Sequence, residues 1–428
     1  MKRLLLLLWA LVALFCWPSA QHPLFEDENQ PKLLEISIGE GTFFEEGLSV
    51  VRHDHGWVPG TRIAPFWKDQ GYDGVRLIGA GQDKTFLDGR GGENALLLSK
   101  HSGYVELVDL TVIGGARQAI FAGFDARGDV PRTPLTISLK RVLVKDSGVR
   151  WDEESTEWLV FTYGADIRIE DSIFDGENTN EHGVYAHGFF RFGAAIRGLE
   201  VLGIGAEALK FTNRPLFSAY LDPGGWIGSH AHEDGVRGVD PGIAFIYVAH
   251  SKIRNWHQPQ SWRGGAGMTV QGGGLNVVVT DCLFEAREGD WKPCIAIDDS
   301  GGEAYAQDGY AVQRRLGRAP NGHIMVRRCL MKSAGTFGEW PQPRPILRLG
   351  SNGTQLGEEH PLALSLTVED CAILGDGSMI EVQRMPEHLV SFDNINTELM
   401  LEQAAEYGLE APLADLNWNG YFEDFVKD

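Results

Sequence analysis

The strongest constraint on the fold is a short pattern of alternating apolar residues that recurs along most of the chain. In each copy, apolar residues alternate with polar ones, a short polar turn follows, and a small or apolar residue begins a second alternation. Clear copies run from Val277 to Phe284 and from Leu366 to Ile373. The position after the turn is occupied by Ala80, Leu110, Val142, Ser172, Leu199, Ser251, Cys282, Cys329 and Cys371. Where these positions are closest they lie about 30 residues apart, which is the repeat length of a solenoid.

The period of two residues within each copy indicates short strands rather than helices. Successive copies can stack as coils, with each strand beside its equivalent in the next coil. The 53 glycines suit the turns between these strands. We therefore predict an all-β chain that forms a single right-handed parallel β-helix of about nine to ten coils, with loop insertions on one face.

The first coils resemble a known superfamily. The segments Ile36 to Phe43, Val75 to Gly81 and Thr85 to Gly89 are similar to the opening coils of the pectate-lyase-like β-helix proteins. The resemblance covers residues 34–395 and implies the fold. This superfamily contains hydrolases, lyases, epimerases and non-enzymatic adhesins, and the sequence lacks both the paired aspartate motifs of polygalacturonases and a catalytic arginine motif of pectate lyases. The resemblance therefore does not select an activity.

The N-terminus has the order of a secretory signal. Lys2 and Arg3 precede the apolar run Leu4 to Trp17, and small residues end at Ala20. The apolar run is short for a membrane span. We expect residues 1–20 to be removed, leaving an exported protein, extracellular or periplasmic, with no membrane span in its mature form.

The remaining chain divides into a β-helix domain at 21–395 and a C-terminal cap at 396–428. Thr397 is expected to cap a short helix from Glu398 to Tyr407, and this tail would cover the last coil. The stretch from Asp415 to Gly420 begins like a calcium loop but has Val426 where a glutamate is required, so a turn is expected there.

The charge balance excludes one class of partner. Lys and Arg number 38 against 59 Asp and Glu, giving a formal net charge of −21. Binding to nucleic acid needs clustered positive charge, so we expect no nucleic-acid partner.

Each coil carries a further strand after the repeated pattern, and its alternation predicts which side chains face the core. The predicted inward pairs are Ile120/Ala122, Leu159/Phe161, Val184/Ala186, Leu209/Phe211, Met268/Val270, Ile295/Ile297, Leu347/Leu349 and Ile380/Val382. The residues between them should stack outward in two columns. The first column is Phe121, Val160, Tyr185, Lys210, Thr269, Ala296, Arg348 and Glu381, and the second is Gly123, Thr162, His187, Thr212, Gln271, Asp298, Gly350 and Gln383. A slip of one residue would reverse these faces.

Insertions follow this strand at 213–243, 299–323 and 351–363. Insertions grouped on one face of a solenoid usually frame its binding site. The catalytic candidates are Lys210, His187, Tyr185 and Arg214. The substrate-binding candidates are Trp226, His230, His232, Gln271, Asp298, Asp299 and Arg348. Adjacent coils lie about 4.8 Å apart, so Tyr185 and Lys210 are expected to be neighbours.

Two chemistries fit these residue types. Elimination on a uronic-acid polysaccharide needs a base beside the carboxylate, for which Lys210, His187 or Tyr185 would serve, and a cation such as Arg214 or bound calcium. Hydrolysis needs two carboxyl groups, for which Asp298, Asp299, Glu233 and Asp234 are the candidates. We expect a polysaccharide lyase, with a glycoside hydrolase or a non-catalytic carbohydrate-binding β-helix as alternatives.

A pair of histidines and a set of three cysteines can each be interpreted either as structural residues or as residues with a chemical role. His230 and His232 lie on one side of an extended segment, as metal ligands would, although zinc requires three or four ligands. Cys282, Cys329 and Cys371 occupy equivalent inward positions, where a stack of small apolar side chains is expected. Export also permits disulfides.

Overall fold

The computed structural model describes residues 31–44, 67, 70–90, 94–99, 103–115, 118–123, 136–146, 158–163, 165–176, 182–187, 189, 192–212, 244–254, 256, 266–271, 275–287, 293–298, 321–333, 346–349, 363–375, 379–382, 385, 387–409, 413 and 415–418. In these segments no helix is long and apolar enough to cross a membrane.

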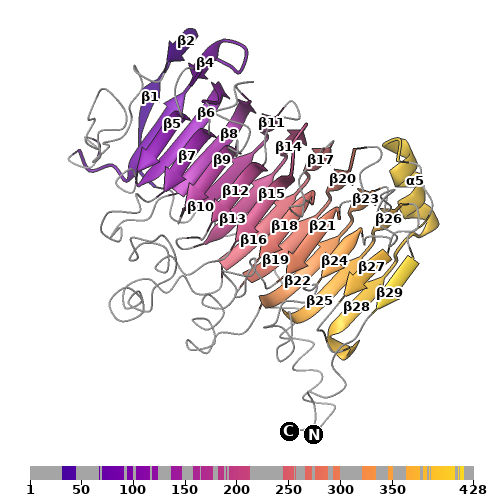
Figure 1. Ribbon diagram of the computed structural model, residues 1–428. Helices are drawn as coiled ribbons and strands as arrows, with labels where there is room; N and C mark the ends of the chain where they lie inside the picture. The colour runs from indigo at the N-terminus through magenta and orange to yellow at the C-terminus, as the bar shows by residue number, and fades with distance from the viewer. Residues whose placement is uncertain are drawn as a thin grey trace, which may run out of the picture.

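The chain is a single right-handed parallel β-helix, as predicted, and its strands stack into an elongated body (Figure 1). In the described segments one sheet, here called sheet B, has ten strands. In order of pairing these are β5 (Asn94–Ser99), β7 (Gln118–Gly123), β9 (Trp158–Tyr163), β12 (His182–His187), β15 (Glu207–Thr212), β18 (Met268–Gln271), β21 (Ile295–Asp298), β24 (Leu347–Leu349), β27 (Met379–Val382) and β29 (Asp415–Trp418).

The other sheet, sheet A, contains the repeated pattern and has 19 strands in the part of the chain that the structure describes. Its first column is β1 (Leu33–Ser37), β3 (Gly74–Ile78), β6 (Tyr104–Ile113), β8 (Thr136–Lys145), β10 (Asp166–Glu170), β13 (Gly193–Arg197), β16 (Ala244–Ala249), β19 (Leu275–Thr280), β22 (Asn321–Arg327), β25 (Ala363–Glu369) and β28 (Val390–Asp393). Its second column comprises β2 (Gly41–Phe44), β4 (Thr85–Asp88), the distal halves of β6 and β8, β11 (Ile173–Asp175), β14 (Glu200–Leu202), β17 (Lys252–Arg254), β20 (Leu283–Glu285), β23 (Leu330–Lys332) and β26 (Ala372–Leu374).

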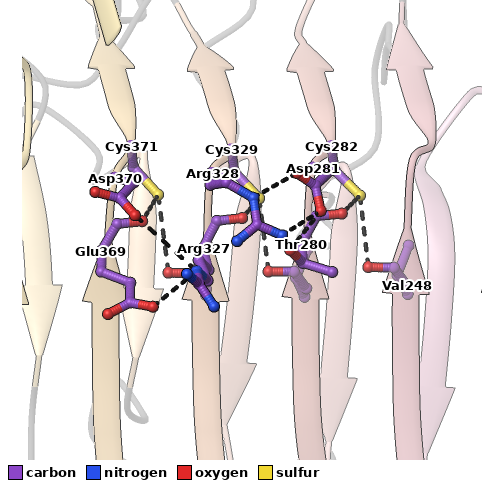
Figure 2. Close-up of polar contacts among 12 residues, drawn as sticks. Val248, Thr280, Asp281, Cys282, Arg327, Arg328, Cys329, Glu369, Asp370 and Cys371 are labelled. Carbon is purple, nitrogen blue, oxygen red and sulfur yellow. Dashed lines mark hydrogen bonds and ion pairs between the residues drawn. The ribbon is translucent and has the colours of Figure 1, made fainter. Parts of the chain in front are cut away.

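The two columns of sheet A are separated by a residue in the left-handed conformation. Asp281 and Arg328 occupy this position in neighbouring coils, with φ of 55° and 47°. Their side chains lie on the outside and form a bidentate ion pair, with Arg328 Nε 2.6 Å from Asp281 Oδ1 and Nη2 2.7 Å from Oδ2 (Figure 2). Arg141 and Asp109 form the same pair nearer the N-terminus. The pairs hold adjacent turns in register.

The next residue points inward, and three consecutive coils place a cysteine there. Cys282, Cys329 and Cys371 are buried free thiols stacked beside one another (Figure 2). Each Sγ donates to the carbonyl oxygen two residues before it, at 3.1 to 3.2 Å. Ser172 and Ser251 make the equivalent bond in earlier coils. The predicted stack of small side chains is confirmed. In these three coils the thiol occupies the position, and makes the hydrogen bond, that a serine has in the earlier coils.

The sequence prediction of the core-facing residues in sheet B is confirmed except in β9. Val184 and Leu209 pair with each other and lie in the core.

In β9, however, it is Val160 that pairs with Val184, while Phe161 pairs with Tyr185. The expected outward placement of Val160 and Thr162 is therefore wrong, and Phe161 and Tyr163 stand in their columns. Of the predicted inward pair, Leu159 does lie in the core, whereas Phe161 belongs to the outer column.

The helix predicted after Thr397 is confirmed as α5 (Glu398–Glu406), and Thr397 Oγ1 accepts a hydrogen bond from the backbone N–H of Met400 at 3.4 Å. A 3-10 turn, η4 (Glu387–Leu389), precedes β28. Met400 and Ala404 of α5 pack against Leu330, Ala372 and Leu374 on the side of the last coils (Figure 1). The turn expected at Asp415 is wrong, because Asp415–Trp418 form β29 and extend sheet B.

Candidate functional site

A compact group of charged and aromatic side chains lies on the outer face of sheet B, on β9, β12 and β15. One row consists of Trp158, His182 and Glu207, paired on neighbouring strands. A second row, three residues further along each strand, consists of Phe161, Tyr185 and Lys210. We call these six residues the charged-aromatic cluster.

Both rows face outward because each strand bends at its start. In β9 and β15 two consecutive residues lie in the core, Leu159 with Val160 and Ala208 with Leu209. The equivalent of Leu159 in β12 is Gly183, where an added Cβ would lie 2.6 Å from the backbone oxygen of Ala208. Glycine is therefore required for this close approach. Because of the bend, two residues that are three positions apart in a strand lie on the same face. In a regular strand they would lie on opposite faces.

Glu207 lies at the centre of the cluster and contacts two basic side chains. Its Oε2 lies 2.9 Å from Nδ1 of His182 on the neighbouring strand. Its Oε1 accepts a hydrogen bond from Nζ of Lys210 at 3.3 Å. Glu207 and His182 are 5% and 2% exposed, whereas 17% of the Lys210 side chain is exposed. The carboxylate is thus held between two basic groups away from solvent.

The electrostatics keep Glu207 ionised. Burial alone would raise its pKa, but the charges of His182 and Lys210, together with their hydrogen bonds, lower the pKa of Glu207 to about 2. A carboxyl group with so low a pKa carries a permanent negative charge at ordinary pH. It is therefore suited to fixing neighbouring cations, and it is a poor proton donor.

Tyr185 is surrounded by the other members of the cluster. Lys210 Nζ lies 5.0 Å from the centroid of its ring, which is a cation–π distance. The rings of His182 and Phe161 lie 5.1 and 5.3 Å from it, and that of Trp158 meets it edge-on at 5.7 Å. This packing fixes the tyrosine ring while leaving the side chain half-buried.

The structure brings together two of the four predicted catalytic residues. Tyr185 and Lys210 are direct neighbours on β12 and β15, as expected. The backbone of His187 pairs with Thr212 and Tyr163, which places it on the same face, but its side chain lies outside the described residues. Arg214 also lies outside them.

The predicted substrate-binding residues are more scattered. Gln271 and Asp298 pair on β18 and β21, and Arg348 lies between Ala296 and Glu381 in the outer column. Thr269 and Ala296 separate Lys210 from Arg348 in that column. The other candidates, Trp226, His230, His232 and Asp299, lie outside the described residues, as do the hydrolase candidates Glu233 and Asp234. The insertions also lie outside them, except for residues 321–323, which begin β22, and Ala363, which begins β25.

Sequence reasoning missed Trp158, His182 and Glu207. One signal for the last two was present, because His182 and Glu207 each stand three residues before a predicted outward residue. Strict alternation places such residues on the opposite face, and the bend at Gly183 and Ala208 reverses this. In the described segments no group of three or more His, Cys, Asp or Glu could hold a metal ion.

No protein-family model and no curated protein matches the chain. The A-module of the mannuronan C-5 epimerase AlgE4 from Azotobacter vinelandii is similar over 91% of this chain and 90% of that chain, with 10% identity and a TM-score of 0.35. The A-module of AlgE6 from the same organism is similar over 91% of each chain, with 11% identity and a TM-score of 0.35. The β-helix itself follows from the strand pairing of this chain.

Proposed function

We propose that the protein is an exported polysaccharide lyase that cleaves a uronic-acid-containing glycan by β-elimination at the charged-aromatic cluster. The observation that carries this proposal is the contact of one buried, ionised carboxylate, Glu207, with His182 and Lys210 beside the ring of Tyr185. Perturbed ionisable groups gathered at one place are more frequent at functional sites than elsewhere.

Elimination requires two proton transfers and one stabilised charge. A base removes the proton on the carbon beside the uronate carboxylate, and the electron pair of that C–H bond moves into the carboxylate. The electrons then return to form a carbon–carbon double bond as the glycosidic C–O bond breaks. A proton delivered to the leaving oxygen completes the cut. A cation placed at the carboxylate lowers the barrier of the first step.

The cluster supplies these roles. Tyr185 is half-buried and carries a hydroxyl, so it transfers a proton to or from the sugar. Lys210 is partly exposed and neutralises the carboxylate of the substrate. His182 and Glu207 are too deeply buried to meet the sugar and instead hold Lys210 and the tyrosine ring. His187 is proposed for the second proton transfer, and Arg214 for a further contact with the carboxylate.

The number of carboxyl groups favours elimination over hydrolysis. Hydrolysis uses two carboxyl groups, one of which must donate a proton. Among the described residues of β9, β12 and β15, the only carboxyl group is that of Glu207. With a pKa of about 2 it cannot act as the acid.

The proposal is tested by assaying the secreted chain on a panel of acidic and neutral polysaccharides, reading ultraviolet absorbance of unsaturated ends and new reducing ends in the same samples. Unsaturated ends that disappear in Lys210→Met support it. Reducing ends without unsaturation would show a hydrolase instead. Tyr407→Phe, a change at an exposed position on the side of α5, serves as the control.

A further inference from the structure

The first three strands of sheet B carry no charged side chain. The sequences of β5, β7 and β9 are NALLLS, QAIFAG and WLVFTY, without a single acidic, basic or histidine residue. The next two strands, β12 and β15, hold His182, Glu207 and Lys210. Along sheet B, the first strand with an ionisable basic or acidic side chain is therefore β12.

The outer face of these three strands, here called the neutral face, is aromatic. Phe121 on β7 and Phe161 on β9 are paired neighbours in the outer column, with ring centroids 5.4 Å apart. Trp158 lies 4.4 Å from Phe161 and continues the surface to the cluster. Phe121 is half-buried, so part of its ring meets solvent. Such rings give apolar contact area on which the C–H faces of a sugar pack.

The neutral face also carries two buried polar atoms without a hydrogen-bond partner. Asn94 is 8% exposed, and its Oδ1 has no partner among the described residues. The indole Nε1 of Trp158 is equally without one. Asn94 and Trp158 both pair with Gln118, which lies between them in the same row.

These two atoms have complementary needs. Buried polar atoms are nearly always hydrogen-bonded, so the missing partners point to a bound molecule or water. Oδ1 of Asn94 needs a donor, and Nε1 of Trp158 needs an acceptor. Because Gln118 lies between the two residues, separate hydroxyl groups of a sugar would serve them, one as donor and one as acceptor, whereas a carboxylate only accepts. A carboxylate placed on this face would also lose its hydration without a cation on these strands to replace it.

We propose that the neutral face binds an uncharged sugar residue, so that the preferred substrate is a polysaccharide in which the uronate is linked to neutral sugars rather than a homopolymer of uronates. This inference rests on the proposed function, because it places the neutral sugar beside the uronate held at Lys210. The net charge of −21 supports it, since a protein of this charge repels a densely anionic polymer more than a partly neutral one.

The test compares initial rates on two polymers of similar length, one a homopolyuronate and the other a copolymer of the same uronate with a neutral sugar. We expect the rate of unsaturated-end formation to be at least about tenfold higher on the copolymer. Equal rates, or a faster rate on the homopolymer, would overturn the neutral-sugar inference and leave the lyase proposal standing.

Two variants of one residue locate the effect. Phe121→Ala should raise the KM for the copolymer by about tenfold with little change in kcat, because it removes a stacking surface. Phe121→Lys should in addition shift the rate ratio toward the homopolyuronate by adding a cation. Phe245→Ala, which removes a ring that is 38% exposed on sheet A, is the matched control and should change neither value. An unchanged KM in Phe121→Ala would contradict the inference.

Binding measured by calorimetry separates the two proposals where no product forms. Copolymer fragments that bind the native chain tightly and Phe121→Ala weakly, without any unsaturated product, would overturn the lyase and support the neutral-sugar site. Fragments of both polymers that bind equally would overturn the neutral-sugar site.

Discussion

His182 and Glu207 face each other on neighbouring coils, with Nδ1 of the histidine 2.9 Å from Oε2 of the glutamate and both side chains shielded from water. Parallel stacking produces this contact, because β12 and β15 pair residue by residue over their length. Glu207 contacts Lys210, and His182 contacts the ring of Tyr185. The buried pair therefore holds the two more exposed side chains of the cluster in place. Four predictions follow from this arrangement and from the thiol stack.

Replacing the anchoring carboxylate should reduce activity without abolishing the fold. Glu207→Gln keeps the size of the side chain but removes the charge that fixes Lys210 and His182. We expect kcat/KM to fall by roughly 10²-fold. The control is Glu402→Gln, which changes an exposed carboxyl group on α5 and should leave kcat/KM unaltered. Full activity in Glu207→Gln would contradict the anchoring role.

The same carboxylate should stabilise the protein above acid pH. The pKa of Glu207 is lowered to about 2 in the folded chain from 4.5. A lowered pKa contributes stability that is complete above the unfolded pKa and is lost as pH falls through the folded one. The contribution is about 3 kcal/mol. Urea unfolding should therefore show the advantage of the native chain over Glu207→Gln shrinking between about pH 5 and pH 2. A difference constant across this range would refute the assignment.

Tyr185 should be needed for chemistry and not for folding. Tyr185→Phe removes only the hydroxyl, and the ring contacts with His182 and Phe161 remain. Loss of a general acid or base reduces the rate by about 10²- to 10⁴-fold, and we expect kcat to fall within this range with the urea midpoint nearly unchanged. A variant that retains more than half of the native kcat would exclude proton transfer by Tyr185.

The stacked thiols should stay reduced and unreactive in the folded protein. Cys282, Cys294, Cys329 and Cys371 are free and buried. Burial raises the pKa of Cys282, Cys294 and Cys371 well above the usual range of a thiol, which leaves little reactive thiolate at these three positions. Cys329 lies between two of them and has no exposed surface that a reagent could reach. Thiol titration of the mature chain should detect none of these groups in buffer and all of them in denaturant without a reducing agent. Fewer thiols in denaturant would reveal disulfides.

The fold could be predicted from the sequence because each coil contains one copy of the same simple pattern, and each copy by itself predicts its strands. The outer columns around Tyr185 and Lys210 followed from strict alternation. The slip in β9 arose because Leu159 and Val160 are both apolar and both buried, so the segment has no clear period. His182 and Glu207 escaped prediction for the same physical reason, since the strands bend just after them. Residues of the predicted insertion at 213–243, such as Arg214 and Trp226, carry no periodic signal that would place them.

The most direct test of the central claim is the mass of the products that the protein releases from a uronate–neutral sugar copolymer. Elimination predicts that the two fragments of each cut add up to the mass of the parent chain and that one of them bears an unsaturated uronate. Fragments that together gain one water for each cut, with no unsaturated end, would contradict the account.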